Sequence, residues 1–179
     1  VNPFASTTLS AALKKANPNL IVLTDDVIYD DVNAEVYMDA AMTKKGFLAS
    51  YYKNQKLSGT PDSTHVDDRI AFDWGYDSIG PGFPKDHFSA RWSFYYKSKE
   101  DGLLRISMGG DDGYRIFVND KLLTGDWGNH AYSHREKTFK VEKGQRYHFV
   151  LEYFDNISSA AVSCNISKKK KKKLYAGLA

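Results

Sequence analysis

The sequence has a single cysteine and no long hydrophobic run. One thiol excludes an internal disulfide framework. Cys164 lies in the apolar stretch AVSCNI, in step with Val162 and Ile166, which predicts a buried and unreactive side chain. No apolar run reaches the roughly 18 residues that a transmembrane helix needs, so no membrane span is predicted. The first ten residues have neither the basic start nor the apolar centre of a signal peptide, which a mature or excised chain would also lack.

Motifs for metal and phosphate chemistry are missing as well. The sequence contains no HExxH motif, no paired-cysteine zinc pattern and no glycine-rich phosphate loop. His130 and His134 are four residues apart, a spacing that suits zinc only on a helix. Because HAYSH is predicted to be loop and strand, these histidines are not expected to bind a metal together.

A glycosidase active site is not expected within this chain. Such a site needs two carboxyl groups that face each other across a cleft, about 5–10 Å apart. The acids occur as adjacent pairs, and neighbours on a strand point to opposite faces. The pairs are Asp25/Asp26, Asp30/Asp31, Asp67/Asp68 and Asp111/Asp112. The chain alone is therefore expected to have no catalytic residues, although acids from separate loops would satisfy the geometry.

Positive charge is concentrated in one place. The net charge is +3, but the run from Lys168 to Lys173 supplies six positive charges. A lysine block can bind nucleic acid or an acidic membrane surface. No arginine or aromatic residue interleaves with this run, which favours a solvated connector and no nucleic-acid partner.

The central part of the chain shows the alternation of β-strands. In HFSARWSFYY, the residues Phe88, Ala90, Trp92, Phe94 and Tyr96 fall on one face, and mostly polar residues fall on the other. The same period of two recurs in the segments 103–109, 114–119, 145–154 and 160–166. Turn-like spacers such as KEDG and EKGQ separate them. This pattern predicts an all-β fold, an antiparallel β-sandwich, over residues 45–167.

The two flanks have a different character. Residues 6–19 contain helix formers behind possible Ser and Thr caps and end at Asn-Pro, and residues 19–26 form a short apolar run. Residues 168–179 hold the lysine run and LYAGLA, which is predicted to start a return helix. We therefore expect residues 1–44 and 168–179 to be short α/β segments of a host domain into which the sandwich is inserted.

Five sequence blocks in fixed order carry a family resemblance. They are GFLASYYKNQKLSGTP at 46–61, DDRIAFDWG at 67–75, FPKDHFSARWSFYY at 83–96, DGLLRISMGGDDGYRIFVNDKLL at 101–123 and EKGQRYHFVLEYFDN at 142–156. Together they resemble the PA14 domain, whose fold is a β-sandwich. The flanks resemble those of family 3 glycoside hydrolases, mostly β-glucosidases, in which such a domain interrupts the α/β domain that follows the catalytic barrel.

This resemblance implies a carbohydrate-binding accessory domain that shapes substrate access to the host active site. The nucleophile and the acid/base would then belong to host domains, and the partners would be these domains and an oligosaccharide or glycoside. A secreted, periplasmic or cell-surface location is expected, with a cytoplasmic location left open.

Loop residues are the candidate sugar contacts, because aromatic faces stack on sugar C–H surfaces and planar polar groups bridge hydroxyls. The candidates are Asp126, Trp127, Asn129 and His130 in one loop, Trp74 and Phe83 in another, and the pair Asp111 and Asp112. The alternative for each tryptophan is a packing role at the end of the sandwich. A structural spacer without a ligand also stays open.

The GGDDG stretch permits two interpretations. In calcium-dependent adhesins with this domain, two adjacent acids ligate calcium; the matching positions here are Asp111, Asp112 and Asn156. Asp followed by Gly between strands also favours a hairpin turn without any metal. The flanks favour the hydrolase branch, so we expect no calcium cofactor and a turn whose acids face solvent or the host. A free-standing calcium-dependent lectin or adhesin domain is the alternative.

Overall fold

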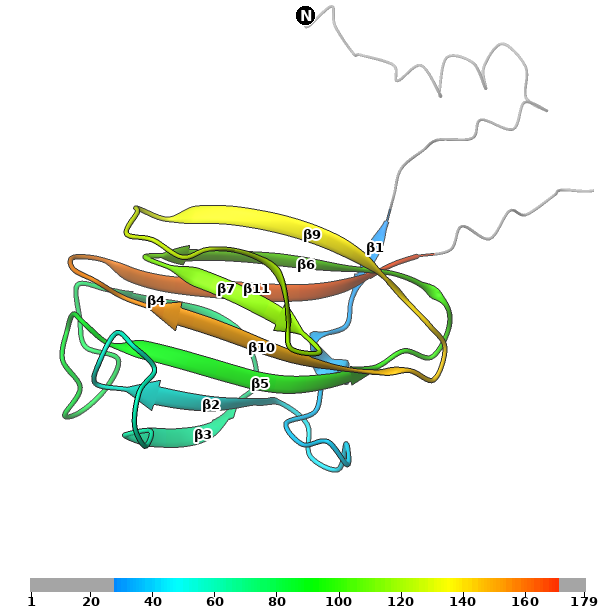
Figure 1. Cartoon of the computed structure of the whole chain (residues 1–179), viewed down its shortest axis with the longest axis horizontal. Coiled ribbons are helices and arrows are strands. Elements are labelled where there is room, and N and C mark those ends of the chain that lie inside the picture. The colour runs from blue at the N-terminus through cyan, green and yellow to red at the C-terminus, as the bar shows by residue number, and fades with distance from the viewer. Residues whose placement is uncertain (1–27, 171–179) are drawn as a thin grey trace, which may run out of the picture.

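The computed structural model describes residues 28–170, and this part of the chain consists of eleven β-strands and one 3-10 turn (Figure 1). The strands are β1 (Tyr29–Asp31), β2 (Phe47–Tyr52), β3 (Ser63–Asp67), β4 (Ile70–Gly75), β5 (Ser89–Lys97), β6 (Gly102–Asp111), β7 (Tyr114–Val118), β8 (Lys121–Asp126), β9 (Ser133–Val141), β10 (Arg146–Phe154) and β11 (Ala160–Lys169). The 3-10 turn η1 spans Asn33–Glu35.

The strands form two antiparallel sheets. The six-stranded sheet has the order β3-β2-β5-β10-β7-β8, and the five-stranded sheet has the order β1-β11-β6-β9, with β4 also paired to β11. β4 and β1 lie end to end along one edge of β11, because they pair with its first and its last residues. The predicted all-β antiparallel sandwich is confirmed.

The core follows from the alternation in the sequence. Phe88, Ala90, Trp92, Phe94 and Tyr96 are all at most 1% exposed, so the face predicted to be apolar is the inner one. Met108, Ile116, Leu151 and Val162 fill the same core from other strands. Cys164 is buried as predicted, and burial raises the pKa of its thiol to about 12. The thiol is therefore protonated and unreactive at neutral pH.

The sandwich extends beyond the boundaries predicted at residues 45 and 167. Tyr29 pairs with Lys169, and Val36 is completely buried in the core. Residues 29–37 therefore belong to the sandwich because they complete the edge of β11 and cover the core. The predicted helix and strand within residues 6–26 and the predicted return helix at 174–179 lie outside the described residues.

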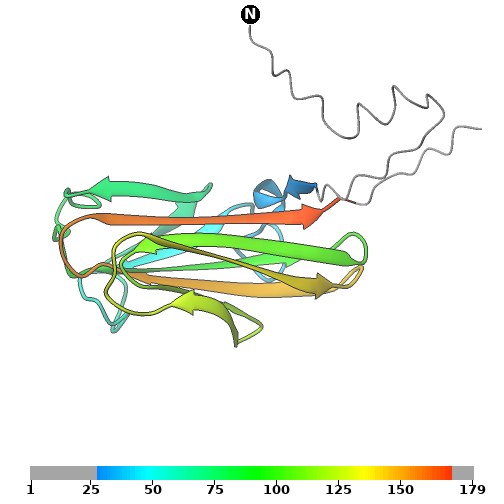
Figure 2. The same cartoon turned by 90° about the horizontal axis from the view of Figure 1, so that it is seen from above.

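The two ends of the sandwich are distinct. Ile28 and Lys170 lie side by side, with the Lys170 N–H donating to the Ile28 carbonyl at 2.8 Å, and they mark what we call the terminal end. The connections 112–113, 127–132 and 155–159 lie at the opposite end, which we call the loop end (Figures 1 and 2).

Candidate functional site

The GGDDG stretch does not form the predicted hairpin. β6 belongs to the five-stranded sheet and β7 to the six-stranded sheet, so Asp112 and Gly113 cross from one sheet to the other. A Cβ atom on Gly113 would overlap the ring of Phe154. Glycine is needed at this position because the chain passes directly against that ring, and not because of a hairpin geometry.

Asp112 is buried and bonded within the domain, which corrects the prediction that both acids face solvent or the host. Its side chain joins three connections of the loop end: Oδ1 accepts the N–H of His130 at 3.0 Å, and Oδ2 accepts the N–H of Asn156 at 2.7 Å. A carboxylate that accepts backbone N–H groups is a strong structural acceptor. Asp112 therefore holds the loop end in shape.

Asp111 differs from its neighbour. It is partly exposed, and its carboxylate accepts no hydrogen bond from the residues that the structure describes. Burial and the adjacent Asp112 carboxylate raise the pKa of Asp111. The carboxylate of Asp111 is thus available to a ligand.

Strand register places Asp111 in a row with a second carboxylate. On β11, Ala161 lies opposite Asp111 of β6 and opposite Asp73 of β4. Asp73 and Asp111 are therefore two strand spacings apart, about 10 Å between Cα atoms, with the small Ala161 between them. In the next row, Ser163 lies between Ala71 and Gly109.

An exposed aromatic ring completes this surface. Tyr132 is 52% exposed, and its hydroxyl lies 3.0 Å from Ser163 Oγ. A Cβ atom on Gly109 would overlap the Tyr132 hydroxyl, so the glycine allows the ring to lie close to the sheet. A groove of about 450 Å³ on the outer face of the five-stranded sheet is lined by Ala71, Phe72, Asp73, Asp111, Tyr132, Ser159, Ala161, Val162 and Ser163. We call it the Asp73–Asp111 groove.

Trp127 lies at the loop end and is 39% exposed. The guanidinium of Arg115 lies 4.0 Å from its ring centroid, and Phe154 packs against it edge-on. Arg115 in turn is held by buried Glu152, whose other oxygen binds Arg91 at 2.6 Å. Trp127 is thus a supported and accessible aromatic surface, with partial packing against Phe154.

The other residues of this loop mainly contact the protein. Asp126 binds Arg135 at 2.8 Å, and this hydrogen bond lowers the pKa of its carboxyl. Burial acts to lower the pKa of His130, but its contacts with the carbonyls of Ala131 and Asp126 prevail and raise it. Asn129 is exposed. His134 lies on β9, where Nε2 is 2.7 Å from Ser107 Oγ.

Trp74 and Phe83 lie elsewhere, in an aromatic cavity of about 310 Å³ formed with Tyr51, His65 and Phe72. Trp74 stacks on Phe72 at 5.0 Å and also packs against the core. Asp67 organises this region by accepting from Trp92 Nε1 at 2.8 Å and from the Tyr51 hydroxyl at 3.0 Å. The loop that carries Trp127 and the cavity that contains Trp74 and Phe83 therefore do not form one site.

Two of the three candidate calcium ligands, Asp112 and Asn156, already accept hydrogen bonds within the protein. Both oxygens of Asp112 accept backbone N–H groups, and the side-chain oxygen of Asn156 accepts from Gln55 Nε2 at 3.0 Å. Calcium takes six to eight oxygen ligands. Within residues 28–170, no group of three or more His, Cys, Asp or Glu is arranged to hold a metal. The absence of a calcium cofactor stays a prediction.

We therefore expect calcium to have no specific effect on stability. Thermal unfolding in calcium should match unfolding in magnesium, and a chelator should leave the melting temperature unchanged, because only specific binding to the native state raises it. A rise seen with calcium alone and absent in Asp111→Asn would contradict this expectation and favour the adhesin alternative.

No helix within the described residues is long and apolar enough to cross a membrane. The comparison with curated proteins matches anti-sigma-I factor RsgI3 of Acetivibrio thermocellus, with 26% identity over 131 residues that make up 73% of this chain and 20% of that protein. The chain thus spans about a fifth of this relative. A solved anti-sigma factor domain-containing protein from Clostridium clariflavum is 27% identical, with a TM-score of 0.62 over 69% of this chain and 42% of that one.

Two more distant structures share the fold. A β-glucosidase from Kluyveromyces marxianus in complex with glucose has a TM-score of 0.66 at 19% identity, over 83% of this chain and 19% of that one. A PA14 sugar-binding domain from an RTX adhesin has a TM-score of 0.52 at 19% identity, over 69% of this chain and 89% of that one. The model of the PA14 domain family matches residues 43–175, and the chain belongs to this family.

Proposed function

We propose that this PA14 domain binds a saccharide in the Asp73–Asp111 groove. The observation that carries the proposal is the row Asp73–Ala161–Asp111 beside the exposed ring of Tyr132. The two carboxylates can accept hydrogen bonds from sugar hydroxyls, and the aromatic ring can stack on a sugar C–H face. The small Ala161 between them leaves room for a sugar ring against the sheet.

The likeness in fold to a sugar-binding domain of an adhesin agrees with this proposal. In this arrangement the domain contributes binding and no bond cleavage. Trp127 remains a candidate for a further contact with a longer saccharide at the same end of the sandwich. A secreted, periplasmic or cell-surface location is part of the proposal, because polymeric saccharides are found there.

We further propose that the domain is an insert in a family 3 glycoside hydrolase of the β-glucosidase type, where it shapes the outer substrate subsites. An insert needs its two ends close together, and Ile28 and Lys170 are hydrogen-bonded neighbours. The fold likeness to a β-glucosidase is consistent with this host. The anti-sigma factor relatives favour a second context, in which the same domain is attached to a protein that is not a glycosidase.

A binding experiment tests the groove. Calorimetric titration of the chain with neutral cello- and laminari-oligosaccharides should show binding that Tyr132→Ala weakens about five-fold, because stacking contributes on the order of 1 kcal/mol. Asp111→Asn should weaken binding by a similar factor without lowering the melting temperature. Tyr76→Ala is the control, since Tyr76 is 72% exposed and lies outside the groove. Equal affinities for all four proteins, or no binding of any neutral saccharide, would overturn the proposal.

A further inference from the structure

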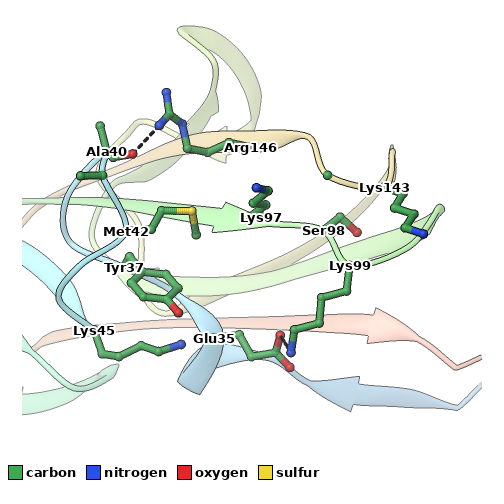
Figure 3. A pocket seen from close by; sticks show the side chains of 12 residues that line it. Glu35, Tyr37, Ala40, Met42, Lys45, Lys97, Ser98, Lys99, Lys143 and Arg146 are labelled. Carbon is green, nitrogen blue, oxygen red and sulfur yellow. Dashed lines mark hydrogen bonds and ion pairs between the residues drawn. The ribbon is translucent and has the colours of Figure 1, made fainter.

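Another hollow lies at the terminal end, far from the Asp73–Asp111 groove. It has a volume of about 740 Å³ and lies between the segment 35–45, the end of β5 and the turn from β9 to β10 (Figure 3). We call it the basic pocket.

Positive side chains surround this pocket. Its lining includes five cationic residues and one carboxylate, that of Glu35. Glu35 forms an ion pair with Lys99, whose Nζ lies 2.9 Å from the Glu35 carboxylate. The remaining cations are Lys45, Lys97, Lys143 and Arg146. None of these four has a carboxylate partner among the described residues, although the whole chain carries a net charge of only +3.

The interior of the pocket is partly apolar. Figure 3 shows Met42 and the ring of Tyr37 between the positive side chains. The Nζ of Lys45 lies 3.9 Å from the centroid of the Tyr37 ring. A ligand would thus meet positive charge at the rim and an aromatic and a thioether side chain inside.

The walls of the pocket are held by hydrogen bonds. Tyr37 exchanges backbone hydrogen bonds of 2.9 and 2.7 Å with Tyr95, which fixes the segment to β5. The carboxylate of Asp39 accepts the N–H groups of Thr43 and Lys44 and so closes the loop that presents Lys45. On the other side, the Gly144 N–H donates to the Ser98 carbonyl at 2.7 Å. These bonds preorganise the pocket, which lowers the entropy cost of binding.

The guanidinium of Arg146 is oriented as well. It donates from Nη1 to the carbonyl of Ala40, as the dashed line in Figure 3 shows. A carbonyl does not neutralise the charge. The other N–H groups of the fork have no hydrogen-bond partner among the described residues and can bind an oxyanion.

We infer that the basic pocket binds a ligand with two or more oxyanion groups on a partly apolar body. Sulfated or uronate saccharides and organic polyphosphates share this chemistry. Four cations without carboxylate partners repel one another, and a multivalent anion that contacts several of them relieves this repulsion. The apolar interior adds contact area that a simple inorganic ion cannot use. This site is separate from the proposed groove for neutral saccharides.

Calorimetric titration of the whole chain at low salt with a sulfated oligosaccharide and, separately, with inorganic tripolyphosphate tests this inference. Binding should weaken at least ten-fold in the double variant Lys97→Gln/Arg146→Gln. The variant Lys97→Gln/Lys143→Gln should show the same loss and leaves the bond between Arg146 and Ala40 intact. The saccharide should bind more tightly than the phosphate, because inorganic tripolyphosphate cannot use the apolar interior. Tighter binding of tripolyphosphate would contradict the inference that the ligand has a partly apolar body.

Two control proteins separate the pocket from general positive charge. Lys121→Gln/Lys137→Gln removes the same charge from exposed positions on β8 and β9. Replacement of Lys171, Lys172 and Lys173 by serine shortens the lysine run. Both controls should bind as the unmodified chain does. The inference is overturned if neither ligand binds, if the controls lose as much affinity as the pocket variants, or if a DNA duplex binds the pocket residues more tightly than either ligand.

Discussion

Replacing Asp112 by alanine is expected to lower the free energy of unfolding by about 3 kcal/mol, whereas the same change at Asp111 should cost less than about 1 kcal/mol. The two residues are adjacent and identical, but only Asp112 is buried and accepts the backbone N–H groups of His130 and Asn156. Its removal leaves both donors without their acceptor. The removal of Asp111 breaks no hydrogen bond between described residues and relieves repulsion between neighbouring carboxylates.

Denaturant unfolding of the two alanine variants measures this difference, and the experiment should be repeated in a chelator. If Asp112 acted only through a bound metal ion, its replacement would have no effect once the chelator is present. The same loss in both buffers would confirm that the carboxylate itself holds the loop end. Equal stability losses for the two variants would contradict the assignment of a structural role to Asp112 alone.

Stability is expected to fall by about 2 to 4 kcal/mol as the pH rises from about 5 to about 8, since one pKa unit equals about 1.4 kcal/mol. Burial, followed by the nearby Asp112 and Asp86 carboxylates, raises the pKa of Asp155 from 3.8 to about 7. Its Oδ1 is buried and accepts no hydrogen bond from the described residues, while Oδ2 accepts the His87 N–H at 3.2 Å. The folded state therefore holds a proton that the unfolded state releases above about pH 4. The resulting stabilisation is complete below that pH and is lost as the pH rises through about 7.

The variant Asp155→Asn tests the source of this pH dependence. It cannot lose a proton, so most of the decline in stability between the two pH values should disappear. A smaller decline should remain, because the raised pKa of His130 acts in the same direction. Asp77→Asn is the control, since the Asp77 side chain is 87% exposed. Melting temperatures measured across this pH range test whether Asp155 is the source. If the melting temperature of Asp155→Asn falls with pH as steeply as that of the unmodified chain, another group is responsible.

The fold was predictable because alternation determines which face of a strand is buried. Ala90, Trp92, Phe94 and Tyr96 recur along β5 with a period of two, and all four are in the core. The edge strand β1 could not be predicted from alternation. β1 has only three residues, too few to show a period, and it belongs to the sandwich because it pairs with the end of β11.

The candidate site was only partly predictable. Asp111 and Tyr132 lie in stretches that the sequence predicts to be loops, where ligand contacts are expected. Asp73 lies within a strand, and no neighbouring residue marks it as a ligand contact. These residues meet because β11 pairs with β4 on one side and with β6 on the other, and no local pattern encodes that register. The basic pocket was missed for a similar reason, since its lysines and Arg146 come from three separate segments.

Sequence alone determined the fold class, the family resemblance, the buried thiol and the inner face of the strands, because these depend on periodicity and on the order of residues along the chain. It did not determine that Asp112 is a structural residue and Asp111 an available one, or that GGDDG crosses between sheets. Those distinctions arise from hydrogen bonds and close packing between segments that are distant in sequence. Only the tertiary structure brings His130, Phe154 and Asn156 to the same turn.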